Sequence, residues 1–376
     1  MYKRLVEYFS VLKDPRCPGK VMHRLIDILV ISVCAVIAGA ESWEDIELYG
    51  QEKVEWLKNF LELQHGTPSH DTFRRLFKIN DPEAVERCFA EWVASFSSVE
   101  EHEVMAIDGK TLRRSFDKSK NQKPFHLLNV FSTRTGMTIG QCKVDGKSNE
   151  ITSIPEILDK LNLKNSIITI DAMGCQRNIA EKIIAQKADY ILALKGNQKH
   201  LHEAVKNYCK INCFSADSSI SPTVDYFDDS HGRQVQRRAF VCPEACHLPE
   251  LQHWSGVRQV LAIETIRQLT NQDNPRCEIR YFLSSCDASA EKQIQAIRSH
   301  WGIENRLHWV LDMSFREDEC RIRDANAARC FSVLRKIALN LVRQDSSKRN
   351  SIKAKRKKAG WSNHYMENVM FSNFRA

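Results

Sequence analysis

Hydrophobic residues recur at helical spacing through the first hundred residues. The segment PSHDTFRRLF (68–77) combines a turn with a helix-start signal at Ser69-His70-Asp71-Thr72. The most apolar stretch, residues 28–40, holds 13 residues without charge, whereas a bilayer-spanning helix needs about 20. We therefore predict a helical N-terminal domain over 1–100, in which this stretch is a buried helix, and no membrane association.

The pattern changes at about residue 101. Apolar, β-branched runs that predict strands occur at 104–110, 126–133, 137–144, 166–174 and 189–196, and helical periodicity occurs at 151–161 and 175–188. Three strands in series, followed by strands that alternate with helices, indicate an α/β fold with an RNase H-like core. Strand order alone does not exclude other α/β folds that share parts of this layout.

The second half of the chain adds two further patterns. Residues 214–286 contain short strands separated by polar loops, which predicts a β-rich insertion in the core. Residues 289–343 return to helical spacing, with EKQIQAIRSHWGIENRLHWVLDMSF as the longest periodic run. We expect a catalytic domain over 101–345 and a basic C-terminal tail over 346–376.

Charge is distributed unevenly. Residues 1–100 hold 12 basic and 16 acidic side chains, residues 101–342 hold 34 and 29, and residues 343–376 hold 9 and 2, so the last segment supplies +7 of the net +8. A basic tail can act as a phosphate-binding arm, and a run of like charge can also be a solvated, poorly ordered end. The residues concerned are Lys353, Lys355, Arg356, Lys357 and Lys358.

The 13 cysteines are odd in number and irregularly spaced, and the start of the sequence, MYKRLVEYF, lacks the apolar run of a signal peptide. Both features predict reduced thiols in a cytoplasmic protein. A zinc site remains an alternative for some of them, although the spacings differ from the usual two-residue knuckle. Its ligands would come from Cys209, Cys213, Cys242, Cys246 and His247.

Two aspartates lie at the ends of predicted strands. Asp108 ends the first core strand and Asp171 ends a strand that reads as buried on both faces. Ligands of open α/β sheets bind at the carboxyl ends of the strands, and an unpaired buried carboxylate is costly, so both positions suit a functional site. Each aspartate alone is also compatible with an ordinary cap of a turn or helix.

Glu304 is the third candidate. On one continuous helix, His300, Glu304, His308 and Asp312 would share a polar stripe, because they are spaced four residues apart. Two alternatives stay open: a metal site formed by His300, Glu304 and His308, or a solvated polar face. Three carboxylates would hold two Mg²⁺ or Mn²⁺ ions, the arrangement that supports phosphodiester cleavage and transfer.

Several motifs together resemble insertion-sequence transposases of the DDE superfamily, specifically the H-repeat-associated proteins linked to Rhs elements, an ISAs-type branch. They span nearly the whole chain. The motifs are AIDGKTLRRS (106–115), TIDAMGCQ (169–176), YILALKGNQ (190–198), IRSHWGIENRLHWVLDMSFREDECRIRDANAA (297–328) and LRKIALNL (334–341). DILVISVCAVIAGAESWEDI and GTPSHDTFRRLF are similar to the helical leader domain of that family.

The resemblance implies that Asp108, Asp171 and Glu304 form a metal-binding catalytic triad that cleaves and joins double-stranded DNA. It also implies a homodimer on DNA and no small-molecule substrate. Related hairpin-forming transposases carry Tyr, Arg, Glu and Lys in a fixed pattern around the acidic helix. Here Glu304 fits that pattern, but Ile297, His300 and Leu311 stand at the other three positions.

Further DNA contacts are expected from Lys195, His300, Arg74 and Arg75, and from the tail residues Lys355, Arg356, Lys357 and Lys358. Two alternatives of a different kind remain: a DNA-binding remnant of a transposase, or a metal-dependent nuclease without strand transfer.

Overall fold

The computed structural model describes residues 1–376 except 145–149, 216–217, 231–232, 270–274, 346–349 and 372–376. The described chain forms two compact units. Unit 1 comprises 1–98, 109–149 and 303–376, and unit 2 comprises 99–108 and 150–302. Strand β1 (Val104–Thr111) crosses the boundary, so its first five residues belong to unit 2 and its last three to unit 1.

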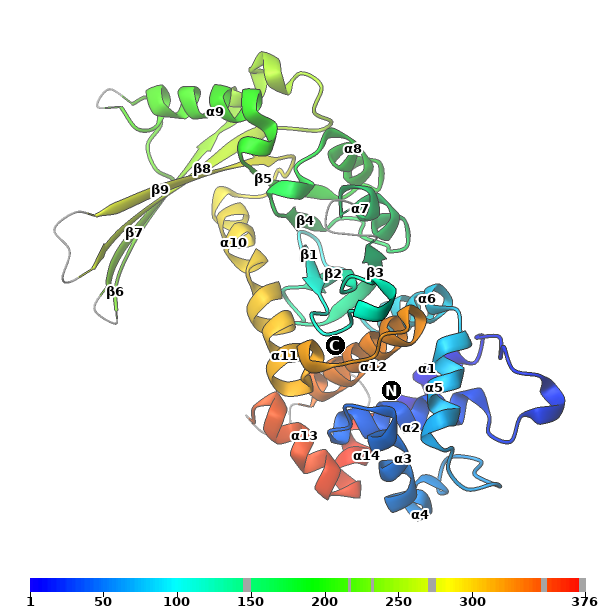
Figure 1. Cartoon of the computed structure of the whole chain (residues 1–376). Helices are drawn as coiled ribbons and strands as arrows, with labels where there is room; N and C mark the ends of the chain where they lie inside the picture. The colour runs from blue at the N-terminus through cyan, green and yellow to red at the C-terminus, as the bar shows by residue number, and fades with distance from the viewer. Residues whose placement is uncertain (145–149, 216–217, 231–232, 270–274, 346–349, 372–376) are drawn as a thin grey trace. The chain divides into compact units, whose positions relative to one another are not determined.

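Unit 1 is mainly helical and is built around α12 (Ala325–Gln344), in which every residue from 330 to 342 is buried. A helix buried on all sides belongs to a core. In Figure 1, α12 lies among the N-terminal helices, and it packs against α2, α5 and α6. The other helices are α1 (Tyr2–Phe9), α2 (Leu25–Ala38), α3 (Trp43–Glu52), α4 (Val54–Leu57), α5 (His70–Ile79), α6 (Pro82–Ala94), α11 (Trp309–Phe315), α13 (Ile352–Trp361) and α14 (Asn363–Phe371).

The apolar stretch predicted as a buried helix is α2, whose residues from Ile28 to Ile37 are all buried. In the described part of the chain, no single helix has both the length and the apolar character to cross a membrane; α2 and α3 pass that test only as a pair bent by 96°. Capping residues mark where the neighbouring helices α3 and α6 begin. Ser42 and Asp45 form a capping box at the start of α3, and Asp81 caps α6 before Pro82.

Unit 2 is a mixed α/β unit that holds most of a large sheet. The strand order is β3-β2-β1-β4-β5-β9-β8-β7-β6. Strand β4 pairs in parallel with β1 on one side and with β5 on the other. Strand β5 pairs antiparallel with β9. The strands of unit 2 are β4 (Ile167–Ile170), β5 (Asp189–Leu194), β6 (Val224–Ser230), β7 (Arg233–Cys242), β8 (Gln259–Leu269) and β9 (Arg276–Ser284).

Strands β2 (His126–Ser132) and β3 (Thr138–Val144), in unit 1, pair antiparallel through the turn expected between 133 and 137. Four antiparallel strands, β6 to β9, occupy the stretch where a β-rich insertion was expected, and they extend the same sheet.

Helices cover the sheet of unit 2 on both faces (Figure 1). Ala296 and Ile297 of α10 (Ala290–His300) pack with Ile167 of β4 and Ile191 of β5. Helix α8 (Arg177–Ala185) packs against β5 and against α7 (Glu150–Asp159), and α9 (Lys199–Asn212) packs against β9.

The helix expected to carry Glu304 differs from the prediction of one continuous α-helix. Helix α10 ends at His300, residues Glu304–His308 form a π-helical turn, and α11 begins at Trp309. A π-turn has i→i+5 hydrogen bonds, so it breaks the four-residue spacing of the predicted stripe. The metal site proposed from His300, Glu304 and His308 depended on that spacing and loses its geometric basis.

Candidate active site and DNA-contact residues

Asp108 and Asp171 occupy neighbouring positions on two paired strands. Asp171 directly follows β4 as predicted, whereas Asp108 lies inside β1, which continues to Thr111 and does not end at Asp108 as the sequence predicted. Strands β1 and β4 are parallel, and their last paired residues are Ile107 and Ile170. The next residue on each strand is one of the two aspartates. Neighbouring strands lie about 4.8 Å apart, so the backbones of these two predicted site residues lie close together within unit 2.

The local environment of Asp171 disfavours its charged form. Asp171 caps the short 3₁₀ turn Ala172–Gly174, and its Oδ1 accepts the backbone N–H of Met173 at 3.0 Å. Although the residue is exposed on one side, partial burial raises the pKa of its carboxyl group, and repulsion from Glu150 adds to the rise. The backbone amides and Lys195 oppose this shift. A bound cation would relieve the remaining cost.

The turn after Asp171 requires glycine at position 174. A Cβ atom placed there would lie 2.2 Å from a methyl carbon of Ile170, far below van der Waals contact. The last residue of β4 therefore packs directly onto the turn that presents Asp171. This close approach explains the glycine in the DAMG motif.

A cavity of about 320 Å³ opens beside Asp171 in unit 2. Its lining comes from β4, β5, β9 and α10 and includes Lys195 and His300, two of the predicted DNA-contact residues. Lys195 follows β5 directly and is exposed. Arg280 and Trp301 also line the cavity. The carboxyl ends of the strands thus form one edge of a pocket that contains acidic, basic and aromatic side chains.

His300 faces this cavity as a neutral side chain. Its Nδ1 lies 3.0 Å from Oγ1 of Thr169, within hydrogen-bond distance. Burial lowers the pKa of His300 to about 4, so the imidazole carries no charge at neutral pH. Any contact with a phosphate would be a neutral hydrogen bond rather than an ion pair.

Glu304 belongs to unit 1, where it is exposed as the first residue of the π-helical turn. In the same turn, Arg306 donates to the backbone oxygen of Thr133 at 2.6 Å, which ties the turn to the β2–β3 hairpin. π-Helical turns are rare and are found frequently at functional sites.

Sequence reasoning missed Lys110, which follows Asp108 by two residues. Its ammonium group is almost fully buried and lies 2.6 Å from a carboxylate oxygen of Asp312 and 3.2 Å from one of Asp318. These contacts lie within unit 1 and fasten α11 to the last part of β1. The signal in the sequence was a lysine directly after the Asp-Gly pair of a strand end, a position where an unpaired cation would be costly to bury.

Arg74 and Arg75 are exposed on α5 and line a cavity of about 750 Å³ in unit 1. Asp71 forms ion pairs with both, at 2.5 and 3.6 Å. Three further exposed cations line the same cavity and were not singled out from the sequence: Lys78, Arg321 and Arg323. We call this group of five residues the α5 basic cluster. The motif ECRIRDANAA contained two of its members, but only folding places them beside α5.

A second basic group lies in unit 2, around a cavity of about 440 Å³ on the β-rich part of the sheet. Its cations are Arg237, Arg267, Arg280 and Arg298. Sequence reasoning did not identify it, because its members come from three strands and a helix that are far apart in the sequence. Arg280 also lines the cavity beside Asp171.

The basic tail differs from the expected arm or solvated end, because it contains α13 and α14. Arg356 is buried and donates to the backbone oxygen of Val36 at 2.7 Å, and Lys355 is buried beside Asp345. Lys358 lies 4.0 Å from the ring centre of Tyr365. Two of the four predicted tail contacts are thus held inside the protein, while Lys357 is exposed.

Two family descriptions match the chain. "Transposase DDE domain" matches residues 100–341, and "DDE_Tnp_1-associated" matches residues 6–93. A protein of Escherichia coli O157:H7 named "Putative transposase YncI" is 44% identical over 98% of this chain and 94% of its own length. One of Escherichia coli K12 named "H repeat-associated putative transposase YhhI" is 40% identical over 98% of each chain.

Among solved structures, a chain titled "Cryo-EM structure of piggyBac transposase synaptic complex with hairpin DNA (SNHP)" aligns with a TM-score of 0.45 and 13% identity. The alignment covers 100% of this chain and 79% of that chain. A likeness this weak carries no argument about the fold. The two family matches and the relatives confirm the resemblance read from the motifs: this chain belongs to the family of proteins with a transposase DDE domain.

Proposed function

We propose that this protein is a DNA transposase that cleaves the ends of its element and joins them to new DNA, with Asp108, Asp171 and Glu304 as its catalytic carboxylates. The observation that supports the proposal is the register of β1 and β4, in which the last paired residues, Ile107 and Ile170, are followed directly by Asp108 and Asp171. Membership of the transposase DDE family supports the same assignment.

In our proposal these carboxylates hold a pair of divalent cations. Asp108 and Asp171 offer hard oxygen ligands, which suit Mg²⁺ or Mn²⁺. Burial and then repulsion from Glu150 raise the pKa of Asp171, and a bound cation would oppose that rise. When bound, two such ions activate the attacking hydroxyl and stabilise the departing oxygen of an in-line displacement. In our proposal Glu304 completes the ligand set from the π-helical turn.

The remaining polar residues of unit 2 would position the DNA backbone. Lys195 is exposed on the cavity edge, where an ammonium group can pair with a phosphate. Neutral His300 can offer its Nε2 as a hydrogen-bonding group, because its Nδ1 already contacts Thr169. Phosphate contacts of this kind fix the register of a strand without reading its sequence.

Double-stranded DNA is the proposed partner, and two surfaces are suited to it. The α5 basic cluster in unit 1 combines five exposed cations around one cavity, and the arginines of β7, β8, β9 and α10 form the second surface in unit 2. Both would bind phosphates and give strongly salt-dependent affinity. Because two element ends must be joined, we propose a homodimer on DNA, working in the bacterial cytoplasm.

We also propose that the sheet is RNase H-like. The central strands β1, β4 and β5 are parallel, β2 and β3 form an antiparallel hairpin, and helices cover both faces in unit 2. This arrangement supports the fold expected from the alternation of strands and helices. Strands β6 to β9 would then be an insertion that lengthens the sheet.

Product analysis tests the function. Purified protein is incubated with labelled DNA that carries the ends of its own element and with a target plasmid, in Mg²⁺ or Mn²⁺. Labelled strands joined to the plasmid are the expected result. Cleavage without joining would replace the proposal with a metal-dependent nuclease. Binding without cleavage in either ion would replace it with a DNA-binding remnant.

A further inference from the structure

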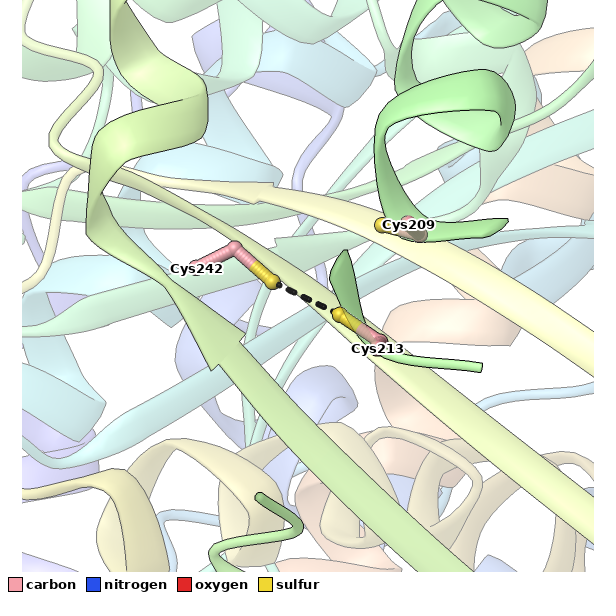
Figure 2. Close-up of side chains that lie close together, drawn as sticks. All are labelled: Cys209, Cys213 and Cys242. Carbon is pink, nitrogen blue, oxygen red and sulfur yellow. Dashed lines mark hydrogen bonds between the residues drawn. The ribbon is translucent and has the colours of Figure 1, made fainter. Parts of the chain in front are cut away.

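Three cysteines that the proposed reaction does not use converge in unit 2. The sulfur atoms of Cys209, Cys213 and Cys242 all lie within 4.8 Å of one another. Figure 2 shows the side chains of Cys213 and Cys242 pointing toward each other, with 3.4 Å between their sulfurs. All three residues are buried, with at most 5% of their surface exposed.

The cluster joins two elements that are separate in the sequence. Cys209 lies in the last turn of α9, Cys213 caps the end of that helix, and Cys242 is the last residue of β7. A four-residue spacing on a helical turn places the first two sulfurs on one side of the helix end. The backbone N–H of Cys213 donates to the oxygen of Cys209, so the turn that presents both is closed.

The electrostatics of the cluster favour a cation. Three thiol groups buried this close together can share one metal ion as thiolates. The carboxyl end of α9 adds the negative end of the helix dipole. A negative charge buried without a positive partner is costly, and thiolates are the form of cysteine that binds metals.

We propose that Cys209, Cys213 and Cys242 bind a structural zinc ion that fastens the end of α9 to β7. Zinc–sulfur bonds of about 2.3 Å in a tetrahedron place sulfurs about 3.8 Å apart, and the cluster needs little movement to reach that spacing. The fourth position is filled by water or by Cys246, which follows Cys242 by four residues and is partly buried.

This site differs in chemistry from the proposed active site. Thiolates select soft ions such as Zn²⁺, whereas the carboxylates of the active site select Mg²⁺ or Mn²⁺. The zinc would hold the inserted strands against α9, which itself packs against β9. The inference is therefore independent of the transposase assignment, and its failure would leave that assignment untouched.

The test uses the full-length chain, purified under reducing conditions and loaded with Zn²⁺ or Co²⁺. We expect about one tightly held zinc ion per chain by elemental analysis, and a sulfur-to-cobalt charge-transfer band on titration with Co²⁺. Serine substitutions at Cys209, Cys213 and Cys242 should each remove the tight ion and the band. The matched control is Cys88→Ser, a buried cysteine of α6 in unit 1, which should keep both.

Two results would overturn the proposal. One is reduced wild-type protein that holds no zinc above background and gives no charge-transfer band. The other is an intact Cys213–Cys242 disulfide in protein purified without reductant, if reduction then creates no zinc site. Because the cobalt titration is done on wild-type protein, before and after thiol alkylation, variants that fail to fold do not remove the test.

Discussion

The ammonium group of Lys110 lies 2.6 Å from a carboxylate oxygen of Asp312. Lys110 belongs to β1, two residues after Asp108, and Asp312 belongs to α11, which follows the π-helical turn of Glu304. A third group, Asp318, lies 3.2 Å from the same ammonium. One buried cation thus fixes the helix after Glu304 to the strand after Asp108.

We predict that Lys110→Met lowers the free energy of unfolding by about 2–3 kcal/mol. This is less than the ~3–5 kcal/mol of a fully buried pair, because Asp312 and Asp318 keep some access to water. Urea denaturation measures the change. Lys110→Met combined with Asp312→Leu should lose less than the sum of the two single substitutions, and full additivity would show that the pair is not coupled.

Asp171→Asn should abolish DNA cleavage and raise the stability of the metal-free protein. Burial and Glu150 raise the pKa of Asp171, so its charge weakens the fold above that pKa and the penalty disappears as the pH falls through it. The asparagine oxygen can still accept the N–H of Met173. Thermal unfolding in EDTA and in Mg²⁺ measures both effects. Wild-type protein should gain stability from Mg²⁺, roughly 2.7 kcal/mol at 100 times the dissociation constant. An equal gain in the variant would remove Asp171 from the ligand set.

Because of His300, we expect the free energy of unfolding to fall in mild acid. Its folded pKa of about 4 lies below the unfolded value of 6.5, so its contribution is complete above pH 6.5 and is lost as the pH falls toward 4. His300→Asn keeps a group that can contact Thr169 and removes the titration. Its unfolding free energy should depend less on pH between 6.5 and 4 than that of the wild type. Parallel curves for the two proteins would show that the pKa of His300 does not differ between the folded and unfolded states.

The α5 basic cluster predicts how DNA affinity depends on salt. Each phosphate contact contributes about −0.9 to the slope of log affinity against log salt. Replacing Arg74, Arg75, Arg321 and Arg323 by alanine should flatten the slope by up to about 3.6 if all four contact phosphates. The control is Lys3→Ala with Lys20→Ala, two exposed lysines elsewhere in unit 1. An unchanged slope in the quadruple variant would exclude the cluster as a DNA surface.

DNA binding by the basic C-terminal tail is best tested by substitutions rather than by a deletion. Removing α13 and α14 would delete the buried side chains of Tyr365, Met366 and Val369 and would uncover the core helix α12, against which both helices pack. Lys353→Ala with Lys357→Ala changes only exposed cations. A flatter salt slope in this variant, with unchanged thermal stability, is the expected result for a phosphate-binding surface. The same slope as the wild type would limit the tail to a structural role.

The sequence predicted the elements that depend on local pattern. The strand before Asp108, the strand before Asp171 and the buried helix α2 all follow from runs of apolar residues. The π-helical turn at Glu304 was not predictable, because helical periodicity does not distinguish i→i+4 from i→i+5 bonding over one turn.

Long-range pairings were equally hidden from the sequence. Arg356 is buried against a partner 320 residues away, because its guanidinium donates to the backbone oxygen of Val36, whereas charge alone suggested exposure. The α5 basic cluster likewise arises from segments that only the fold brings together. Cys209, Cys213 and Cys242 were already candidate zinc ligands in the sequence, and the fold places their sulfur atoms close to one another.

The most direct test of the central claim is cleavage of a plasmid that carries the element ends, in Mg²⁺ or Mn²⁺ and in EDTA, by the wild type and by Glu304→Gln. The control is Glu291→Gln, which changes an exposed glutamate of α10. We predict metal-dependent nicking and joining by the wild type and the control, and none by Glu304→Gln, with DNA binding retained in all three. Full cleavage by Glu304→Gln would contradict the three-carboxylate site.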